Sequence, residues 1–145
     1  MLDKEKIKEI IPQREPFLMI DEVEEFEPGK YVVAIKRVET DEYYFEGHFP
    51  GNPVMPGVLI LEAMAQAGAV GVLSAPENTG KNAIFGGIEN ARFRDMVVPG
   101  DTLRITVSLD AMRSRGGKGR GEVIKISPDG TEKKCASAEM LFMII

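Results

Sequence analysis

The longest apolar stretch of this chain, residues 54–75, does most to limit how the chain can fold. By length alone it could cross a membrane as a helix. However, Pro56 stands near its start, Glu62 and Gln66 lie inside it, and its flanks lack the basic residues that anchor membrane spans. We therefore predict a helix from about Pro56 to Leu73 that is buried on nearly all sides within a soluble domain, with no membrane partner.

The rest of the chain is patterned mainly as strands. Leu103, Ile105, Val107 and Leu109 alternate with polar residues, which predicts an antiparallel strand with one buried face. We expect residues 17–38 to form two more strands, separated by a Pro-Gly turn at residues 27–30, and further strands in residues 82–94, 119–127 and 131–144.

The remaining segments are short. Residues 3–11 predict an amphipathic helix that Asp3 caps and Pro12 ends, and residues 40–56 predict a loop with one helical turn near 43–46. A helix that is apolar all round needs cover, which a curled antiparallel sheet provides, while its open side would press against a second copy. We therefore expect an α+β fold, with a long central helix wrapped by the sheet in a single domain of residues 1–145.

Charge and cysteine content disfavour several classes of function. The 145 residues carry 18 Lys and Arg against 23 Asp and Glu, whereas nucleic-acid backbones are bound by basic surfaces. The only cysteine, Cys135, cannot form an intrachain disulfide and is interpreted as buried filler in a strand. Without a Cys/His cluster we expect no metal site. An N-terminus without a signal-peptide pattern, together with the lone cysteine, favours the cytoplasm.

The residues best suited to chemistry stand where the loop meets the long helix, in residues 47–66. This segment, GHFPGNPVMPGVLILEAMAQ, has three prolines and three glycines that fix the loop, and it holds the only histidine, His48, and a single acid, Glu62. A lone imidazole on a rigid loop and a lone carboxylate in an apolar helix can form an acid/base pair. Taken alone, a loop histidine such as His48 is more often a surface or turn residue than a catalytic one. Taken alone, Glu62 is explained equally well as a buried structural acid and as a catalytic acid.

Extended to GHFPGNPVMPGVLILEAMAQAG, this segment resembles the signature of the bacterial (3R)-3-hydroxyacyl-[acyl-carrier-protein] dehydratases of fatty-acid synthesis, which have the hot-dog fold. Further matches follow in the same order, at residues 18–21, 33–36, 87–88, 91–94 and 97–101. The resemblance implies dehydration of a (3R)-3-hydroxyacyl thioester to a trans-2-enoyl thioester. It also implies acyl carrier protein as partner, with the substrate on its phosphopantetheine arm and no cofactor in the enzyme.

Such a dehydration requires a base, an acid and stabilisation of an enolate-like oxygen. His48 suits the base, because an imidazole exchanges protons near neutral pH. Glu62 suits the acid, because apolar surroundings raise the pKa of a carboxyl group by desolvation. The N–H groups of Gly57 and Val58 at the helix N-terminus can hold the thioester oxygen. Gln66, one turn after Glu62, is either an orienting residue for that carboxyl group or a plain structural one.

The resemblance also implies that His48 of one subunit works with Glu62 of another, so that a homodimer is the minimum unit and a trimer of dimers is expected. Related bifunctional dehydratase/isomerases carry Asp where Glu62 stands, which favours a dehydratase without isomerase activity. The chain departs from the family pattern at Gln13, where many relatives have His, at Glu15, where many have an aromatic residue, and at residues 95–96.

A basic cluster stands out in this acidic chain, and it is interpreted either as a solvated hairpin tip or as a dock for the acidic carrier protein and its phosphate. The cluster comprises Arg113, Arg115, Lys118 and Arg120, with Arg92 and Arg94 as further candidates. Ile84 and Phe85 either line an acyl tunnel or pack in the core. Two other functions stay open, a hot-dog thioesterase and a non-catalytic subunit that binds acyl chains or carrier protein.

Overall fold

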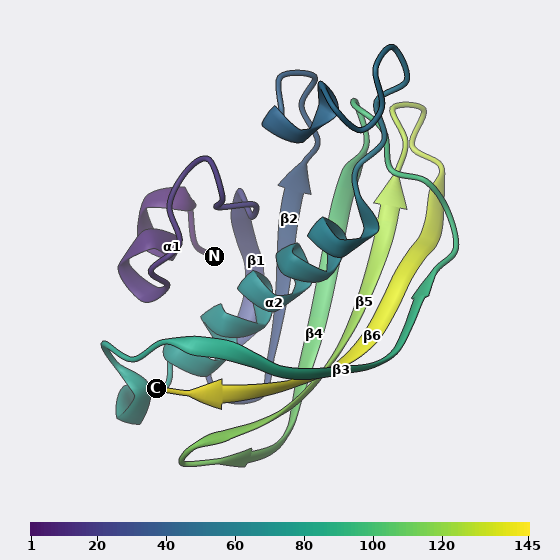
Figure 1. Ribbon diagram of the computed structural model, residues 1–145. Helices are drawn as coiled ribbons and strands as arrows, with labels where there is room; N and C mark the ends of the chain where they lie inside the picture. Colours follow the sequence, from purple (N-terminus) through teal and green to yellow (C-terminus); the bar gives the residue numbers. More distant parts are fainter.

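A long helix, α2, lies across one face of a curved six-stranded antiparallel sheet (Figure 1). The computed structural model describes residues 1–145. In chain order the elements are α1 (Lys4–Ile10), β1 (Glu22–Glu27), β2 (Tyr31–Arg37), the 3₁₀ turn η1 (Tyr43–Phe45), α2 (Gly57–Leu73), the 3₁₀ turn η2 (Pro76–Asn78), β3 (Ala83–Phe93), β4 (Thr102–Arg113), β5 (Gly116–Ile126) and β6 (Glu132–Ile144). The predicted α+β hot-dog architecture is confirmed.

The order of strands explains why α2 crosses the sheet. The strands are arranged β1-β2-β4-β5-β6-β3, and every neighbouring pair is antiparallel. The chain leaves β2 near one edge, runs through α2, and enters β3 at the opposite edge. β4, β5 and β6 then fill the space between β2 and β3. The two edge strands are β1 and β3, and β3 has a strand neighbour on one side only.

The core lies between α2 and the inner face of the sheet. From Ala67 to Leu73 every residue of α2 is buried, and the inward side chains Leu103, Ile105 and Val107 of β4 have no exposed surface. Fully burying side chains of this size contributes about 1.5–3 kcal/mol each. The predicted burial of the helix on nearly all sides is confirmed. No helix of the structure is long and apolar enough to span a membrane.

The structure confirms the predicted cap of the first helix and corrects the predicted starts of two strands. The side chain of Asp3 accepts a hydrogen bond from the N–H of Lys6 at 2.9 Å, so the predicted cap of α1 is confirmed. The prediction of strand from residue 17 was wrong, because β1 begins at Glu22. The carbonyl of Phe17 and the N–H of Met19 instead form hydrogen bonds with the side chain of Gln66. β5 begins at Gly116 rather than at residue 119, because the glycines that suggested a loop are paired within the sheet.

Candidate active site

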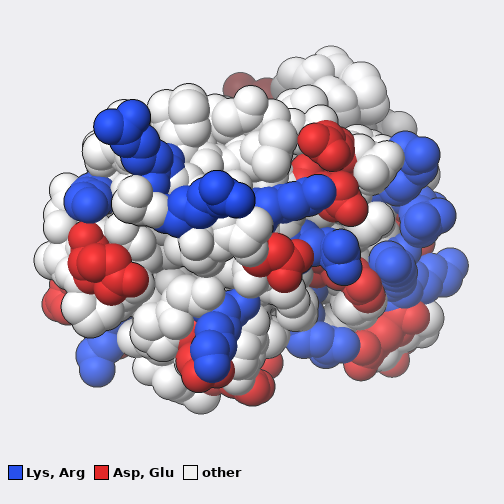
Figure 2. All heavy atoms as spheres, turned by 90° about the horizontal axis from the view of Figure 1, so that it is seen from below, with Lys and Arg blue, Asp and Glu red and all other residues white.

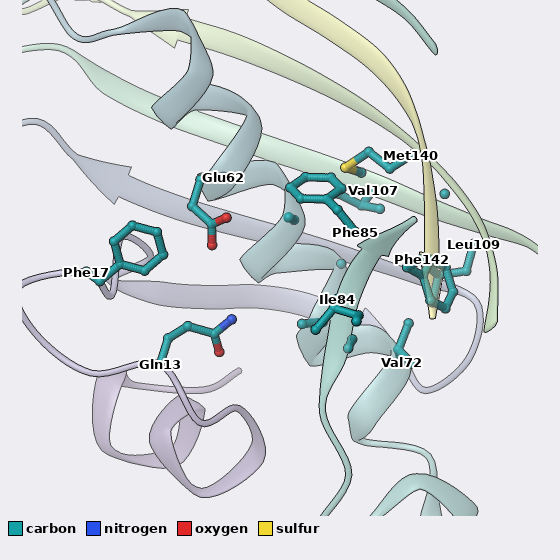
Figure 3. A pocket seen from close by; sticks show the side chains of 15 residues that line it. Gln13, Phe17, Glu62, Val72, Ile84, Phe85, Val107, Leu109, Met140 and Phe142 are labelled. Atoms are coloured by element: carbon teal, nitrogen blue, oxygen red, sulfur yellow. The ribbon is translucent and has the colours of Figure 1, made fainter. Parts of the chain in front are cut away.

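Glu62 stands on the second turn of α2 with its carboxyl group at a cavity (Figure 3). The side chain is partly buried, and this desolvation raises its pKa. The hydrogen bond that it accepts from Gln66 acts in the opposite direction and is the smaller effect. Glu62 is therefore protonated more readily than an exposed glutamate, which is the form that a general acid needs.

Gln66 is the fully buried residue that holds the Glu62 carboxyl group. Its Nε2 donates to Oε2 of Glu62 at 3.0 Å and to the carbonyl of Phe17 at 2.9 Å. Its Oε1 accepts the N–H of Met19 at 2.7 Å. Both amide protons and the amide oxygen are thus used, and the backbone partners fix which way the amide points. Gln66 therefore joins Glu62 to the N-terminal segment.

The cavity beside Glu62 is apolar and has a volume of about 260 Å³. It lies between α2 and strands β3 to β6, with Glu62, Gln13 and Phe17 at one end and Leu109 and Phe142 at the other (Figure 3). Ile84 and Phe85 of β3 line it between these ends. Its other lining residues include Gly68 and Val72 of α2 and Val107, Gly119 and Met140 of the other strands. A narrow apolar cavity with one carboxyl group near its end suits a hydrocarbon chain attached to a polar reacting group.

His48 lies on the loop that precedes α2, and both its side chain and its backbone form hydrogen bonds with Val54. Its Nδ1 lies 2.7 Å from the carbonyl oxygen of Val54, while its own carbonyl accepts the N–H of Val54 at 2.9 Å. A carbonyl only accepts, so Nδ1 carries the proton in this bond and Nε2 keeps a free lone pair. The imidazole stacks on the ring of Phe49, with centroids 3.9 Å apart. This geometry prepares Nε2 to take up a proton.

Glu62 lines the apolar cavity, but His48 does not. The loop of His48 is instead anchored elsewhere, because the N–H of Met55 donates to the carbonyl of Val97 at 2.8 Å. The cavity that Glu62 lines therefore contains no histidine of the same chain.

Gly57 begins α2, and the helix has no side-chain cap. The N–H groups of Gly57 and Val58 donate to no backbone carbonyl, as expected for the first turn of a helix. The positive end of the helix dipole adds to their attraction for an anionic oxygen. A side chain at Gly57 would come within 3.0 Å of the Phe93 ring, so this glycine lets β3 pass close to the helix end. Val58 itself is exposed at the surface.

The six basic residues singled out in the sequence do not form one surface within the chain. Arg94 bonds the carbonyl of Cys135 and Arg115 accepts from Ile144, at opposite ends of β6. Cys135 and Ile144 are nine positions apart along the strand, which is about 30 Å. Lys118 and Arg120 lie 3.3 Å and 3.9 Å from Glu139, which neutralises part of their charge. In the view of Figure 2, Lys and Arg are interspersed with Asp and Glu rather than gathered in one basic field.

Two cavity residues were not identified as functional from the sequence. Phe17 was given no role, and Gln13 was noted only as a departure from the family pattern, yet both lie beside Glu62 (Figure 3). The Oε1 of Gln13 is buried and has no hydrogen-bond partner. A buried acceptor without a partner can accept a hydrogen bond from a ligand. Neither residue belongs to a periodic apolar pattern, so only the path of the N-terminal segment over α2 reveals their position.

Comparison with known proteins identifies the family. Residues 11–131 match the model of the FabA-like domain. The 3-hydroxyacyl-[acyl-carrier-protein] dehydratase FabZ of Enterococcus faecalis is 55% identical over 96% of this chain and 95% of its own length. The chain belongs to this family of dehydratases. The FabZ dehydratase of Pelotomaculum thermopropionicum is 53% identical over 99% of both chains, so the similarity reaches both ends of the sequence.

Solved structures agree on the fold of this dehydratase. The dehydratase heterocomplex ApeI:P from Xenorhabdus doucetiae has a TM-score of 0.75 at 17% identity, over 94% of this chain and 89% of that chain. A thioesterase superfamily member from Thermus thermophilus has a TM-score of 0.63 at 20% identity, over 84% of this chain and 85% of that chain. At such low identities the likeness concerns the arrangement of helix and strands, which is shared by dehydratases and thioesterases alike.

Proposed function

We propose that this dehydratase converts (3R)-3-hydroxyacyl-[acyl-carrier-protein] to the trans-2-enoyl product in fatty-acid elongation, with His48 of one subunit and Glu62 of its partner copy as base and acid. The observation that carries the proposal is the partly buried Glu62, with its raised pKa, at the end of an apolar cavity. The substrate class is that of the FabZ relatives, which share more than half of the sequence over nearly the whole chain.

In the proposed reaction, Nε2 of His48 takes a proton from the carbon next to the thioester carbonyl. The electron pair left behind forms an enolate, whose oxygen accepts hydrogen bonds from the N–H of Gly57 and of Val58. Protonated Glu62 donates to the 3-hydroxyl group as its C–O bond breaks, so the oxygen leaves as water rather than as hydroxide. The new double bond forms from the enolate electrons, and proton exchange returns His48 and Glu62 to their starting forms.

A second copy of the chain supplies the missing histidine in this proposal. β3 is an edge strand with exposed apolar side chains, among them Ile88 at 43% and Phe93 at 49% exposure. An edge with free backbone groups and apolar side chains is suited to pairing with another strand. Phe93 also touches the start of α2 at Gly57, so an interface along β3 would adjoin the proposed oxyanion site. A dimer is therefore the minimum active unit, and a trimer of dimers stays a prediction.

For carrier-protein docking we favour Arg92 and Arg94 over the hairpin residues. They flank Phe93, which lies against Gly57, and both are exposed and without an ion-pair partner. Arg113 and Arg115 lie near the opposite end of β6, beside the far end of the cavity. A basic pair next to the oxyanion site is well placed to attract an acidic carrier and the phosphate of its arm.

The test of this function is turnover of a 3-hydroxyacyl carrier-protein thioester, followed by absorbance of the conjugated enoyl product and by mass spectrometry. The wild type should form the enoyl thioester, and His48→Ala and Glu62→Gln should each lower the rate by about 10²-fold or more. Release of free acid without an enoyl product would instead indicate a thioesterase. Undiminished turnover in both variants would eliminate the mechanism.

A further inference from the structure

The far end of the apolar cavity carries an unusual run of glycines. β5 has Gly117, Gly119 and Gly121 at alternate positions, so all three leave the same face of the strand without a side chain. That face is the inner one, because Gly119 lines the cavity and a side chain at Gly121 would collide with Met64 of α2. Glycine weakens a strand and usually marks a place where something approaches its backbone closely.

At Gly121 and Gly117, the group that approaches the strand backbone is a side chain of the protein itself. Met64 occupies the space at Gly121, and a Cβ at Gly117 would lie 3.0 Å from the ring of Phe142. Gly119 differs, because the nearest atoms to a Cβ there would be Val107 Cγ1 at 3.5 Å and Leu109 Cδ2 at 3.6 Å, which is ordinary van der Waals contact. No protein atom needs the space at Gly119, and that space is part of the cavity.

Leu109 closes the cavity next to Gly119. The two residues are paired in register between β4 and β5. One methyl group of Leu109 would lie 3.6 Å from a Cβ at Gly119, and the other 3.1 Å from a Cβ at Gly71 of α2. The side chain therefore spans from the sheet to the helix and forms an end wall. Glu62 lies at the opposite end of the cavity (Figure 3).

We propose that Gly119 and Leu109 together determine the longest acyl chain that this dehydratase accepts. The inference rests on the proposed function, in which the acyl chain extends from the reacting carbons beside Glu62 into the cavity. The last methylene groups of a long chain then pass over the bare backbone at Gly119 and stop against Leu109. A side chain at 119 would shorten the cavity from the sheet side, and loss of the Leu109 side chain would lengthen it.

The test compares 3-hydroxybutyryl, 3-hydroxyoctanoyl and 3-hydroxydodecanoyl thioesters of the carrier protein. Gly119→Ala and Gly119→Val should lower the ratio of kcat/KM for the longest chain accepted by the wild type to kcat/KM for 3-hydroxybutyryl by about 10-fold or more, as expected for excluding a methylene group. Leu109→Ala should shift the preference toward longer chains. Ser108→Val adds bulk on the outer face beside Leu109, where the side chain is exposed, and should leave the length profile unchanged.

The outcomes separate this inference from the proposed function. A wild type that dehydrates none of the three substrates would overturn the function, and the inference with it. An active wild type whose length profile is the same in Gly119→Val and Leu109→Ala would overturn the inference alone. An equal loss on all three substrates would also overturn it, because a length limit must spare the shortest chain. Opposite shifts in the Gly119 and Leu109 variants would support it.

Discussion

The Nε2 of Gln66 donates a hydrogen bond to Oε2 of Glu62 at 3.0 Å, across one turn of α2. The same amide also donates to the carbonyl of Phe17 and accepts the N–H of Met19, so it cannot turn away without losing both of these hydrogen bonds. The carboxyl group is thus held by a residue that is itself fixed. The bond lowers the pKa of Glu62, whereas burial raises it more strongly.

Replacement of Gln66 by Met should separate these two effects. Gln66→Met removes the hydrogen bond that lowers the pKa of Glu62, so that pKa should rise further and the alkaline limb of the kcat–pH profile should move to higher pH. Because Phe17 and Met19 lose their partners, the free energy of unfolding should fall by about 1–3 kcal/mol. Rate profiles and urea unfolding measure the two changes. An alkaline limb that moves to lower pH would refute the role given to this bond.

Glu62→Gln should change how stability depends on pH. Because the pKa of Glu62 is raised in the folded chain, its favourable contribution is complete below the unfolded pKa and is lost as pH rises through the folded pKa. The variant has no such loss, so its stability relative to the wild type should increase over that pH window. Urea unfolding of both proteins across the window tests this expectation. Parallel stability curves would mean that burial does not penalise the charged carboxylate.

The role of the Gly57 N–H can be tested with two substitutions that both add a Cβ atom at this position. Gly57→Pro removes the N–H, and proline is compatible with the first position of a helix that follows an extended residue such as Pro56. Gly57→Ala keeps the N–H and is the matched control, because both variants crowd Phe93. If this N–H holds the enolate oxygen, kcat of the proline variant should be about 10²–10³-fold below that of the alanine variant. Equal rates would argue against this donor.

Carrier docking at Arg92 and Arg94 should appear in KM rather than in kcat. The double variant Arg92→Ala/Arg94→Ala should raise KM for the carrier-protein substrate, most strongly at low ionic strength, and leave KM for a simple pantetheine thioester unchanged. Arg113→Ala/Arg115→Ala removes the same charge at the other end of β6 and serves as control. A larger increase in KM from the Arg113→Ala/Arg115→Ala variant would instead indicate that the carrier protein docks at the β4–β5 hairpin.

Much of the fold followed from local patterns. The alternation of apolar and polar residues in 103–109 predicted β4, because one face of that strand is buried. The long apolar run predicted α2, because that helix is buried on nearly all sides. The start of β5 was missed, because Gly116, Gly117 and Gly119 lack the side chains that make a strand recognisable, and their pairing with β6 is a long-range contact. One of these glycines, Gly119, lines the cavity, so a local pattern could not reveal the far end of the cavity.

The candidate site was predictable where it is continuous in sequence. His48, Gly57, Glu62 and Gln66 fall within a single segment, and the structure gives Glu62 and Gln66 the contact that their helical spacing predicted. Gln13 and Phe17 were not predicted, because they reach the cavity through the tertiary path of the N-terminal segment. The sequence also could not show that Arg94 and Arg115 lie toward opposite ends of β6, because strand pairing is a long-range contact.

The most direct test of the account is co-expression of two inactive subunits, one with His48→Ala and one with Glu62→Gln, followed by measurement of dehydration by the purified mixed oligomer. A mixed dimer contains one site with both His48 and Glu62 intact if each site is built from two subunits. Random pairing should then restore about one quarter of wild-type activity, whereas each variant alone stays inactive. A mixed oligomer that remains as inactive as its parents would contradict a site shared between subunits.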